Sequence, residues 1–148
     1  MSDALDSALR EMRASGNYDA LLQAIPYARN LGLTAAVEDG VLVTRMPPRD
    51  RLIGNPVLPA LHGGTVGALM ESAAILELLR EVDTPSVPKT INLTIDYLRS
   101  ARVVLTHARA TITRQGRRVA NVQVRAWQED PERPIAVAHA HFLLRSGG

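Results

Sequence analysis

The fold of this chain is decided by residues 61–74, which read LHGGTVGALMESAA. Two glycines open a predicted helix, and the turns that follow carry small or apolar residues and one carboxylate, Glu71. The residues three and four positions from Glu71 are Gly, Ala, Ala and Ile, so its own helical stripe is apolar. Burying an unpaired carboxylate is costly, so Glu71 must be paired, kept neutral or used in chemistry, unless it simply faces water. Glu77, which precedes Arg80 and Glu81, predicts instead the solvated end of the same helix.

Length and composition predict one globular domain. The chain has 148 residues, of which 46% are hydrophobic and 22% charged, enough to bury a sizeable core. It contains no cysteine, which excludes disulfides and thiolate metal sites. No apolar run approaches the ~20 residues that span a membrane, and no signal-peptide core stands at the N-terminus. We therefore expect a cytoplasmic protein that does not bind membranes.

The charge pattern favours a small anionic ligand over nucleic acid. The formal net charge is only +2, although the isoelectric point is near 9.5 and arginines gather in the C-terminal half. The chain has three tyrosines, one phenylalanine and one tryptophan, and no run interleaves them with arginine. We expect no nucleic-acid binding and favour a small phosphorylated ligand instead.

The first half of the chain predicts helices, a hairpin and a loop. Residues 3–24 have a helical pattern that is interrupted around Gly16 and closed by Pro26. Two short apolar runs then flank Asp39-Gly40, which is typical of a β-hairpin. The runs cover residues 33–37 and 41–46. A proline-rich loop over residues 47–59 leads into the central helix, predicted from about Gly64 to Arg80.

After residue 85 the hydrophobic period changes from 3.6 to 2, which predicts strands. Four alternating strands are expected, over residues 90–97, 104–112, 120–126 and 136–144. Consecutive strands with one buried face predict an antiparallel meander, and the apolar helix is the only element able to cover that face. Together the elements predict an α+β hotdog fold, an antiparallel sheet wrapped around a central helix. We expect residues 1–148 to form one such domain, with residues 1–26 as an N-terminal helical segment.

The sequence around the helix start resembles a known family. Residues 55–64 read NPVLPALHGG, and Glu71 follows His62 by nine positions. Hotdog-fold acyl-CoA thioesterases of the phenylacetyl-CoA and 4-hydroxybenzoyl-CoA type show a similar pattern: an Asn in the loop, His-Gly-Gly at the helix start, and an acid nine residues after the His. Residues 95–101, IDYLRSA, are similar to that family's strand after the helix. The resemblance covers about residues 33–144. It implies hydrolysis of an acyl-CoA to free acid and coenzyme A, with no cofactor beyond the coenzyme A of the substrate.

The chemistry of thioester hydrolysis gives the glycines and the carboxylate separate roles. It needs hydrogen-bond donors for the charge on the carbonyl oxygen, and a base or nucleophile opposite them. A helix start offers unpaired N–H groups and a positive dipole end, and glycine lets a carbonyl approach the backbone. We expect the Gly63 amide, helped by Gly64, to bind that oxygen, although a tight turn would also explain the glycine pair. Glu71 is then a general base toward water or a nucleophile that forms an anhydride, and the sequence leaves both open.

Three further residues are candidates for the site. His62 is expected to orient or hydrogen-bond rather than to act as the base, unless it only caps the helix. Asn55 either bonds the substrate carbonyl or the attacking water, or makes an Asx turn before Pro56. By family position, Thr90 matches a Ser or Thr that holds the water in some relatives. Others place a hydroxyl one turn after the acid, where this chain has Ile75.

Surface arginines are expected to bind the phosphates of coenzyme A, because the chain has no glycine-rich phosphate loop. The candidates are Arg99, Arg114, Arg117 and Arg118. The exposed edges of a hotdog sheet predict a homodimer with a continuous sheet, doubled into a homotetramer. The resemblance implies that each site is shared. Asn55, His62 and Gly63 would come from one subunit, and Glu71 and Thr90 from its partner.

Two other functions stay open. A hotdog hydratase or dehydratase of acyl thioesters also needs a His and a carboxylate or Asn near a helix, although it places the acid differently relative to the His. A non-catalytic acyl-CoA-binding module gains nothing from Glu71 on an apolar stripe. No metal site is expected, since His139 and His141 share one strand face without a third ligand. His107 is expected to be structural.

Overall fold

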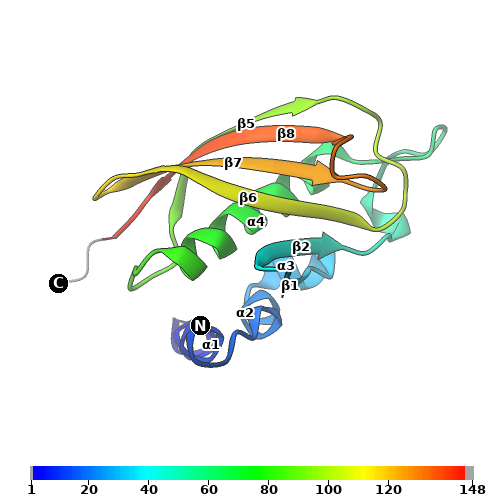
Figure 1. Cartoon of the computed structure of the whole chain (residues 1–148). Helices are drawn as coiled ribbons and strands as arrows, with labels where there is room; N and C mark the ends of the chain where they lie inside the picture. The colour runs from blue at the N-terminus through cyan, green and yellow to red at the C-terminus, as the bar shows by residue number, and fades with distance from the viewer. Residues whose placement is uncertain (1, 146–148) are drawn as a thin grey trace.

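A six-stranded antiparallel sheet curls around one long helix in the computed structural model, which describes residues 2–145 (Figure 1). The helix is α4, Gly63–Glu81. The strands are β1 Thr34–Glu38, β2 Val41–Met46, β5 Lys89–Tyr97, β6 Thr106–Gln115, β7 Val119–Trp127 and β8 Ala136–Leu143, in the order β1-β2-β6-β7-β8-β5. The predicted α+β hotdog fold is confirmed.

The hydrophobic core lies between α4 and the inner face of the sheet. Small residues make up much of that face. The buried alanines of β6, β7 and β8 are Ala108, Ala120, Ala126, Ala136, Ala138 and Ala140. Alanine has a low strand propensity, so these positions are explained by packing: they leave room for the helix to approach the sheet. Leu69, Met70 and Phe142 are fully buried in the same core. No helix within residues 2–145 combines the length and the apolar character of a membrane-crossing segment.

Three short helices precede the sheet (Figure 1). They are α1 Ser2–Ser15, α2 Tyr18–Ala24 and α3 Pro26–Leu31. The predicted interruption is confirmed, since Gly16 has a φ of 74° and Asn17 caps α2 by accepting a hydrogen bond from the Ala20 amide. The prediction that Pro26 closes the helical segment is wrong, because Pro26 begins α3. Proline is favourable at a first helical position, where its missing N–H has no intrahelical acceptor.

The first hairpin is confirmed, and the loop after it holds more structure than predicted. β1 and β2 pair across Asp39-Gly40, whose φ values of 51° and 80° fit a type I′ turn. The predicted loop over residues 47–59 contains a 3₁₀ helix, Asp50–Leu52, and strand β3, Ile53–Asn55, which pairs with β4, Ala60–Leu61. Strands of two or three residues between prolines are too short to show a period, so the sequence pattern missed this small second sheet.

The predicted meander is correct for three strands and wrong for β5. Strands β6, β7 and β8 follow one another as hairpins, but β5 pairs with β8, on the side away from β7. All four strands alternate in the same way, so alternation could not tell which of them are neighbours. As a result, β5 is an edge strand of nine residues.

Thr44 gives a test of core stability. It is fully buried, and within residues 2–145 its hydroxyl has no hydrogen-bond partner. Thr44→Val keeps the side-chain shape and removes an unsatisfied polar group, so we expect it to raise the free energy of unfolding by about 1–2 kcal/mol. The measurement is the urea midpoint at fixed protein concentration.

The matched control is Thr106→Val. Thr106 is also fully buried, but its hydroxyl donates to the Val104 carbonyl at 3.1 Å and accepts from Gln128 Nε2 at 3.1 Å. Losing these bonds should lower the free energy of unfolding by about 1–3 kcal/mol. A Thr44→Val midpoint at or below that of the parent would contradict the prediction.

Candidate active site

His62 forms the entry into α4. It has extended backbone dihedrals, φ −63° and ψ 129°, and its Nδ1 accepts a hydrogen bond from the Gly64 amide at 2.9 Å. Its carbonyl accepts a hydrogen bond from the Thr65 hydroxyl at 2.7 Å. An accepting Nδ1 places the proton of the neutral ring on Nε2. His62 is therefore the N-cap of the helix, and a further role in the chemistry stays a prediction.

Within residues 2–145, the amides of Gly63 and Gly64 at the helix start have no helical carbonyl as acceptor. The Gly64 amide is taken by His62. The Gly63 amide stands at the first helical position, where an α-helix provides no intrahelical acceptor, and at the positive end of the helix dipole. Gly63 is thus the glycine whose N–H can donate a hydrogen bond to a substrate carbonyl oxygen. The help expected from Gly64 would require its amide to leave His62.

Tyr97 adjoins the same helix start, and sequence reasoning missed it. Its hydroxyl donates to the Gly63 carbonyl at 2.7 Å. A Cβ atom added to Gly63 would lie 3.1 Å from Tyr97 Cζ, so the ring covers the glycine α-carbon closely. Alternation alone makes Tyr97 one more strand residue. The signal that could have found it was the family-like run IDYLRSA, in which it stands.

Asn55 lies at the end of β3, close to the helix start. Its Oδ1 accepts hydrogen bonds from the amides of Val57 at 3.0 Å and Leu58 at 3.3 Å, which is the Asx turn that the sequence allowed. The side-chain oxygen is thus occupied, and the Nδ2 group is the part that can donate to a substrate. Gly54 fixes the strand against the helix start, because a Cβ there would lie 2.7 Å from the His62 α-carbon.

Glu71 and Thr90 form a second polar pair, farther along α4. The Thr90 hydroxyl donates to Glu71 Oε2 at 3.1 Å. A β-bulge permits this contact: Thr90 and Asn92 lie opposite consecutive residues of β8, so Ile91 is an extra residue in the strand. Strict alternation would turn Thr90 to the same face as Asn92. The bulge instead places it opposite Phe142, which is buried in the core beneath the sheet.

Glu77 corrects one expectation, because it is not a solvated residue. Its side chain is only 13% exposed, and Tyr18 of α2 lies close to it. Burial raises the pKa of Glu77, while Arg80, whose guanidinium is 3.5 Å from the carboxylate, acts to lower it. The partner observed for Glu71 within residues 2–145 is a hydroxyl, whereas Glu77 forms an ion pair with Arg80. A chemical role for Glu71 stays a prediction.

These contacts define two half-sites. The amide half-site is Gly63 with His62, Asn55 and Tyr97, and the acid half-site is Glu71 with Thr90. Gly63 and Glu71 are eight residues apart on one helix, which separates them by roughly 12 Å along its axis. A reacting carbonyl must lie about 3 Å from both the oxyanion donor and the attacking group. The two half-sites of one chain therefore cannot act on the same thioester.

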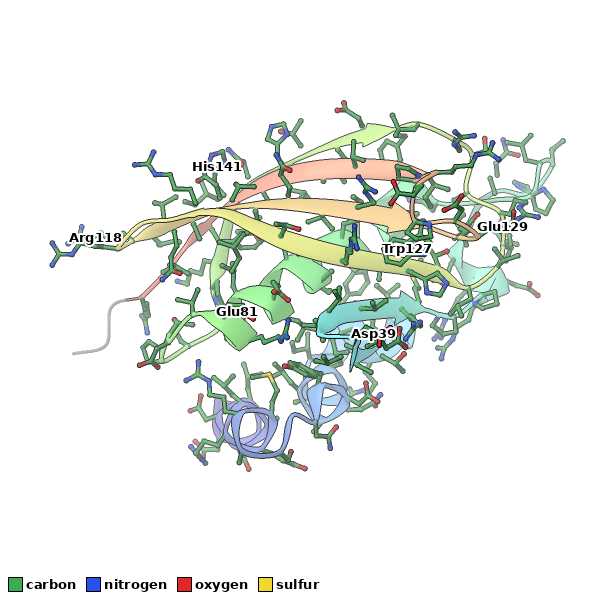
Figure 2. The ribbon with its side chains drawn as sticks, in the orientation of Figure 1. Asp39, Glu81, Arg118, Trp127, Glu129 and His141 are labelled. Carbon is green, nitrogen blue, oxygen red and sulfur yellow. The ribbon has the colours of Figure 1, made fainter. Side chains whose placement is uncertain are left out.

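The arginines expected to bind phosphate are divided between the two ends of the sheet. Arg99 adjoins the amide half-site, since it lines a hollow of about 390 Å³ whose wall includes Gly63. The other three, Arg114, Arg117 and Arg118, are exposed around the turn between β6 and β7, where Figure 2 shows Arg118 at the tip. That turn lies at the end of the sheet where β5 begins, because Lys89 and Val119 both pair with Leu143. The turn arginines thus lie at the same end as the acid half-site.

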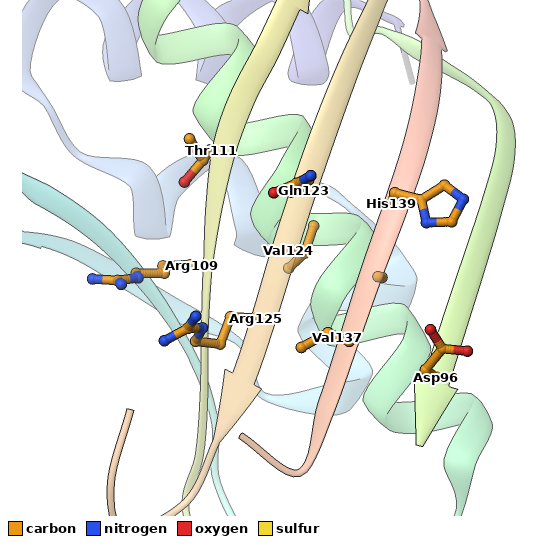
Figure 3. A pocket seen from close by; sticks show the side chains of 9 residues that line it. Asp96, Arg109, Thr111, Gln123, Val124, Arg125, Val137 and His139 are labelled. Atoms are coloured by element: carbon orange, nitrogen blue, oxygen red, sulfur yellow. The ribbon is translucent and has the colours of Figure 1, made fainter. Parts of the chain in front are cut away.

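A polar hollow of about 310 Å³ lies on the outer face of the sheet, with α4 behind the strands (Figure 3). His139 lines it, whereas His141 forms a hydrogen bond through Nδ1 with Asn92 Oδ1 at 2.8 Å. Among residues 2–145 no group of three or more His, Cys, Asp or Glu could hold a metal ion. His107 stacks on Trp127 with ring centroids 5.4 Å apart, and burial lowers the pKa of His107. None of the predicted catalytic residues lines this hollow.

Comparison with known proteins places the chain in a family. A model of the Thioesterase superfamily matches residues 58–135 of the 148. The chain therefore belongs to the thioesterase superfamily, and thioester hydrolysis is its class of activity. No curated protein matches the chain.

Three solved structures are similar over most of the chain. A protein from Chromobacterium violaceum is 35% identical, with 95% of this chain and 98% of the other covered and a TM-score of 0.78. A phenylacetic acid degradation-related protein from Ralstonia eutropha is 26% identical, with 86% and 98% covered and a TM-score of 0.72. A Bacillus halodurans protein crystallised with CoA is 21% identical, with 99% and 94% covered and a TM-score of 0.70, and it shows the same fold.

The contact between Thr90 and Glu71 gives a test of the acid half-site. Thr90→Val removes the hydroxyl that orients the carboxylate, and a hydrogen bond to a charged group is strong enough that thioester hydrolysis should fall about 10- to 100-fold. Thr90→Ser keeps the hydroxyl and should stay near the parental rate. Thr94→Val, on the exposed side of the same strand, is the matched control. Equal rates in Thr90→Val and Thr94→Val would show that the hydroxyl has no part in hydrolysis.

Proposed function

We propose that this protein is an acyl-CoA thioesterase whose active site is shared between two copies of the chain. The observation that carries the proposal is the separation of the amide half-site from the acid half-site. Membership of the thioesterase superfamily supports hydrolysis, and the similar protein crystallised with CoA supports a coenzyme A thioester as the substrate.

The two edges of the sheet differ in how they are protected. At the β1 edge the Ala35 amide donates to the Asp19 carboxylate of α2 at 2.8 Å, so the N-terminal helices cap part of that edge. The β5 edge has no further strand beside it within residues 2–145, and it carries half-exposed Ile91 and Tyr97. A long open edge with apolar side chains is a pairing surface for another strand. A second copy of β5 is the occupant that closes this edge symmetrically.

Antiparallel pairing of two β5 strands about a two-fold axis would complete the site. Thr90 stands near the start of β5 and Tyr97 at its end, roughly 20 Å apart along the strand. In an antiparallel pair the start of one strand lies beside the end of the other. The acid half-site of one subunit then meets the amide half-site of its partner, and the two-fold axis repeats this at the other end.

The same arrangement would gather the cations around the substrate. Arg99 of one subunit and the turn arginines of its partner would converge on each shared site, where guanidinium groups suit the phosphates of coenzyme A. Both sets therefore stay candidates for binding the nucleotide. Doubling of the dimer into a tetramer also stays a prediction.

In the shared site the thioester carbonyl oxygen accepts hydrogen bonds from the Gly63 amide and from Asn55 Nδ2. As a base, Glu71 of the partner subunit takes a proton from water while the water oxygen attacks the carbonyl carbon. As a nucleophile, the same carboxylate attacks and forms an anhydride, which water then hydrolyses. Both routes place an oxyanion at Gly63, break the carbon–sulfur bond and release coenzyme A and the free acid.

Replacement of Glu71 tests the chemical role. We expect Glu71→Ala and Glu71→Gln to lower acyl-CoA hydrolysis roughly 10²–10⁴-fold with the fold intact, because the base or nucleophile is lost. The measurement is release of free thiol from a panel of aryl- and fatty acyl-CoA substrates. Parental rates in both variants would remove Glu71 from the mechanism. A parent protein that binds these substrates and releases no thiol would be a binding module instead.

Mixing two inactive variants tests the shared site. Glu71→Ala disables the acid half-site and Asn55→Ala the amide half-site. In a mixed dimer one site carries both changes and the other carries neither, so activity should return. With equal amounts and free exchange, half of the dimers are mixed and each has one intact site, which gives roughly a quarter of the parental activity.

Asn55→Asp is the matched control for the loop. It keeps an oxygen acceptor for the Asx turn and loses the Nδ2 donors, so it should be inactive alone and should complement Glu71→Ala as Asn55→Ala does. Exchange of subunits is verified by mass spectrometry of differently tagged chains. A mixture that contains mixed dimers and remains inactive would refute the shared site.

A further inference from the structure

The peptide group between Gly63 and Gly64 is held at both ends by side chains. Its carbonyl oxygen, on Gly63, accepts from the Tyr97 hydroxyl at 2.7 Å. Its N–H, on Gly64, donates to His62 Nδ1 at 2.9 Å. The two bonds polarise one peptide group in the same sense, so each strengthens the other. Holding this group limits rotation about the Gly63 backbone, and with it the direction of the Gly63 amide.

Two consecutive glycines would otherwise leave the helix start loosely ordered. Glycine has the greatest backbone freedom of any residue and a poor helix propensity. The N–H groups of a first turn also lack the intrahelical bonds that order later turns. His62 restrains the Gly63–Gly64 peptide from the preceding residue, and Tyr97 restrains it from the end of β5. β5 thus restrains the helix start, which the two glycines alone would leave flexible.

We propose that Tyr97 is a positioning residue, whose hydroxyl holds the Gly63–Gly64 peptide so that the Gly63 amide points at the substrate carbonyl oxygen. This inference rests on the role of Gly63 in the proposed acyl-CoA thioesterase. Tyr97 is 53% exposed, so filling the core does not account for it. Its ring covers the Gly63 α-carbon, and one turn farther on a Cβ at Gly67 would lie 2.9 Å from Ile95 Cδ1. The end of β5 therefore packs directly on the first turn of α4, whose orientation sets the direction of the Gly63 amide.

Tyr97→Phe is the test, because it keeps the ring and removes the hydroxyl. We expect kcat for acyl-CoA hydrolysis to fall roughly 10- to 100-fold, as for a displaced catalytic group, while KM changes less than about twofold. Tyr27→Phe is the matched control, since Tyr27 lies on α3 and is exposed to a similar extent, 55%. The control should keep the parental kcat.

A second measurement does not depend on turnover. The chain has ten glycines, so labelling with ¹⁵N-glycine gives a simple amide spectrum in which Gly63 and Gly64 can be followed. In Tyr97→Phe the order parameters of these two amides should fall from the rigid range of about 0.85 toward values below about 0.6. Gly32, whose amide donates to the Arg29 carbonyl, should keep its parental value.

The outcomes separate the inference from the function on which it rests. A parental kcat in Tyr97→Phe, or a lower kcat with Gly63 and Gly64 still rigid, would overturn the positioning role. A lower melting temperature with loss of order at all glycines would also overturn it, because Tyr97 would then be a structural residue. Loosened glycines in Tyr97→Phe together with full activity in Glu71→Gln would leave the restraint standing and refute the proposed function.

Discussion

Burial of α4 against the alanine-rich face of the sheet is the interaction on which the rest of the structure depends. Residues such as Ala108 and Ala136 have little intrinsic preference for strands, yet at these positions they let the helix lie close to the sheet. Close approach brings side chains of β5 within hydrogen-bond distance of α4 at two separate places, Thr90 at Glu71 and Tyr97 at Gly63. A larger residue on that face would push the helix away and lengthen both contacts at once.

The rigidity of the helix also explains why one chain holds both proposed half-sites without bringing them together. A helix cannot fold back between Gly63 and Glu71, and their separation is fixed by the rise per residue. The strand that contacts both groups is itself extended, so Thr90 and Tyr97 stay far apart along it. A second copy placed against the free edge is the simplest geometry that brings the two kinds of group together, and it uses the one long edge that the N-terminal helices leave open.

The sequence predicted features that arise from local burial and missed those set by distant parts of the chain. The apolar stripe of α4, the Asp39-Gly40 turn and the strand alternation are local, and they led to the correct fold. The neighbour of β5 depends on where the chain returns after α4, and alternation carries no such information. Glu77 has charged neighbours in sequence, but its burial comes from elements that lie far from it in sequence.

The residues of the candidate site also divide into those that local sequence predicts and those that depend on distant parts of the chain. The spacing from His62 to Glu71 singled out both residues, because a helix fixes the geometry of its own members. Thr90 was named from family position, and strict alternation would have turned it away from Glu71. Tyr97 contacts a backbone carbonyl, and strand alternation carries no sign of such a contact. Strand register and contacts to the main chain are therefore where sequence reasoning stops for this site.

Ile91 is the bulged residue of β5 and has no partner residue in β8. A strand without Ile91 would alternate regularly and would also place its threonine opposite Phe142. The interval of nineteen positions from Glu71 to Thr90 thus includes one bulged residue, and the hydrogen bond between the two side chains does not require that interval. A search pattern that fixes this interval would reject proteins that build the same pair on an unbulged strand. It would also accept proteins whose hydroxyl stands at the right count on the wrong face of the sheet. Relatives with this arrangement are better recognised by which residue of the neighbouring strand the hydroxyl faces than by counting along the chain.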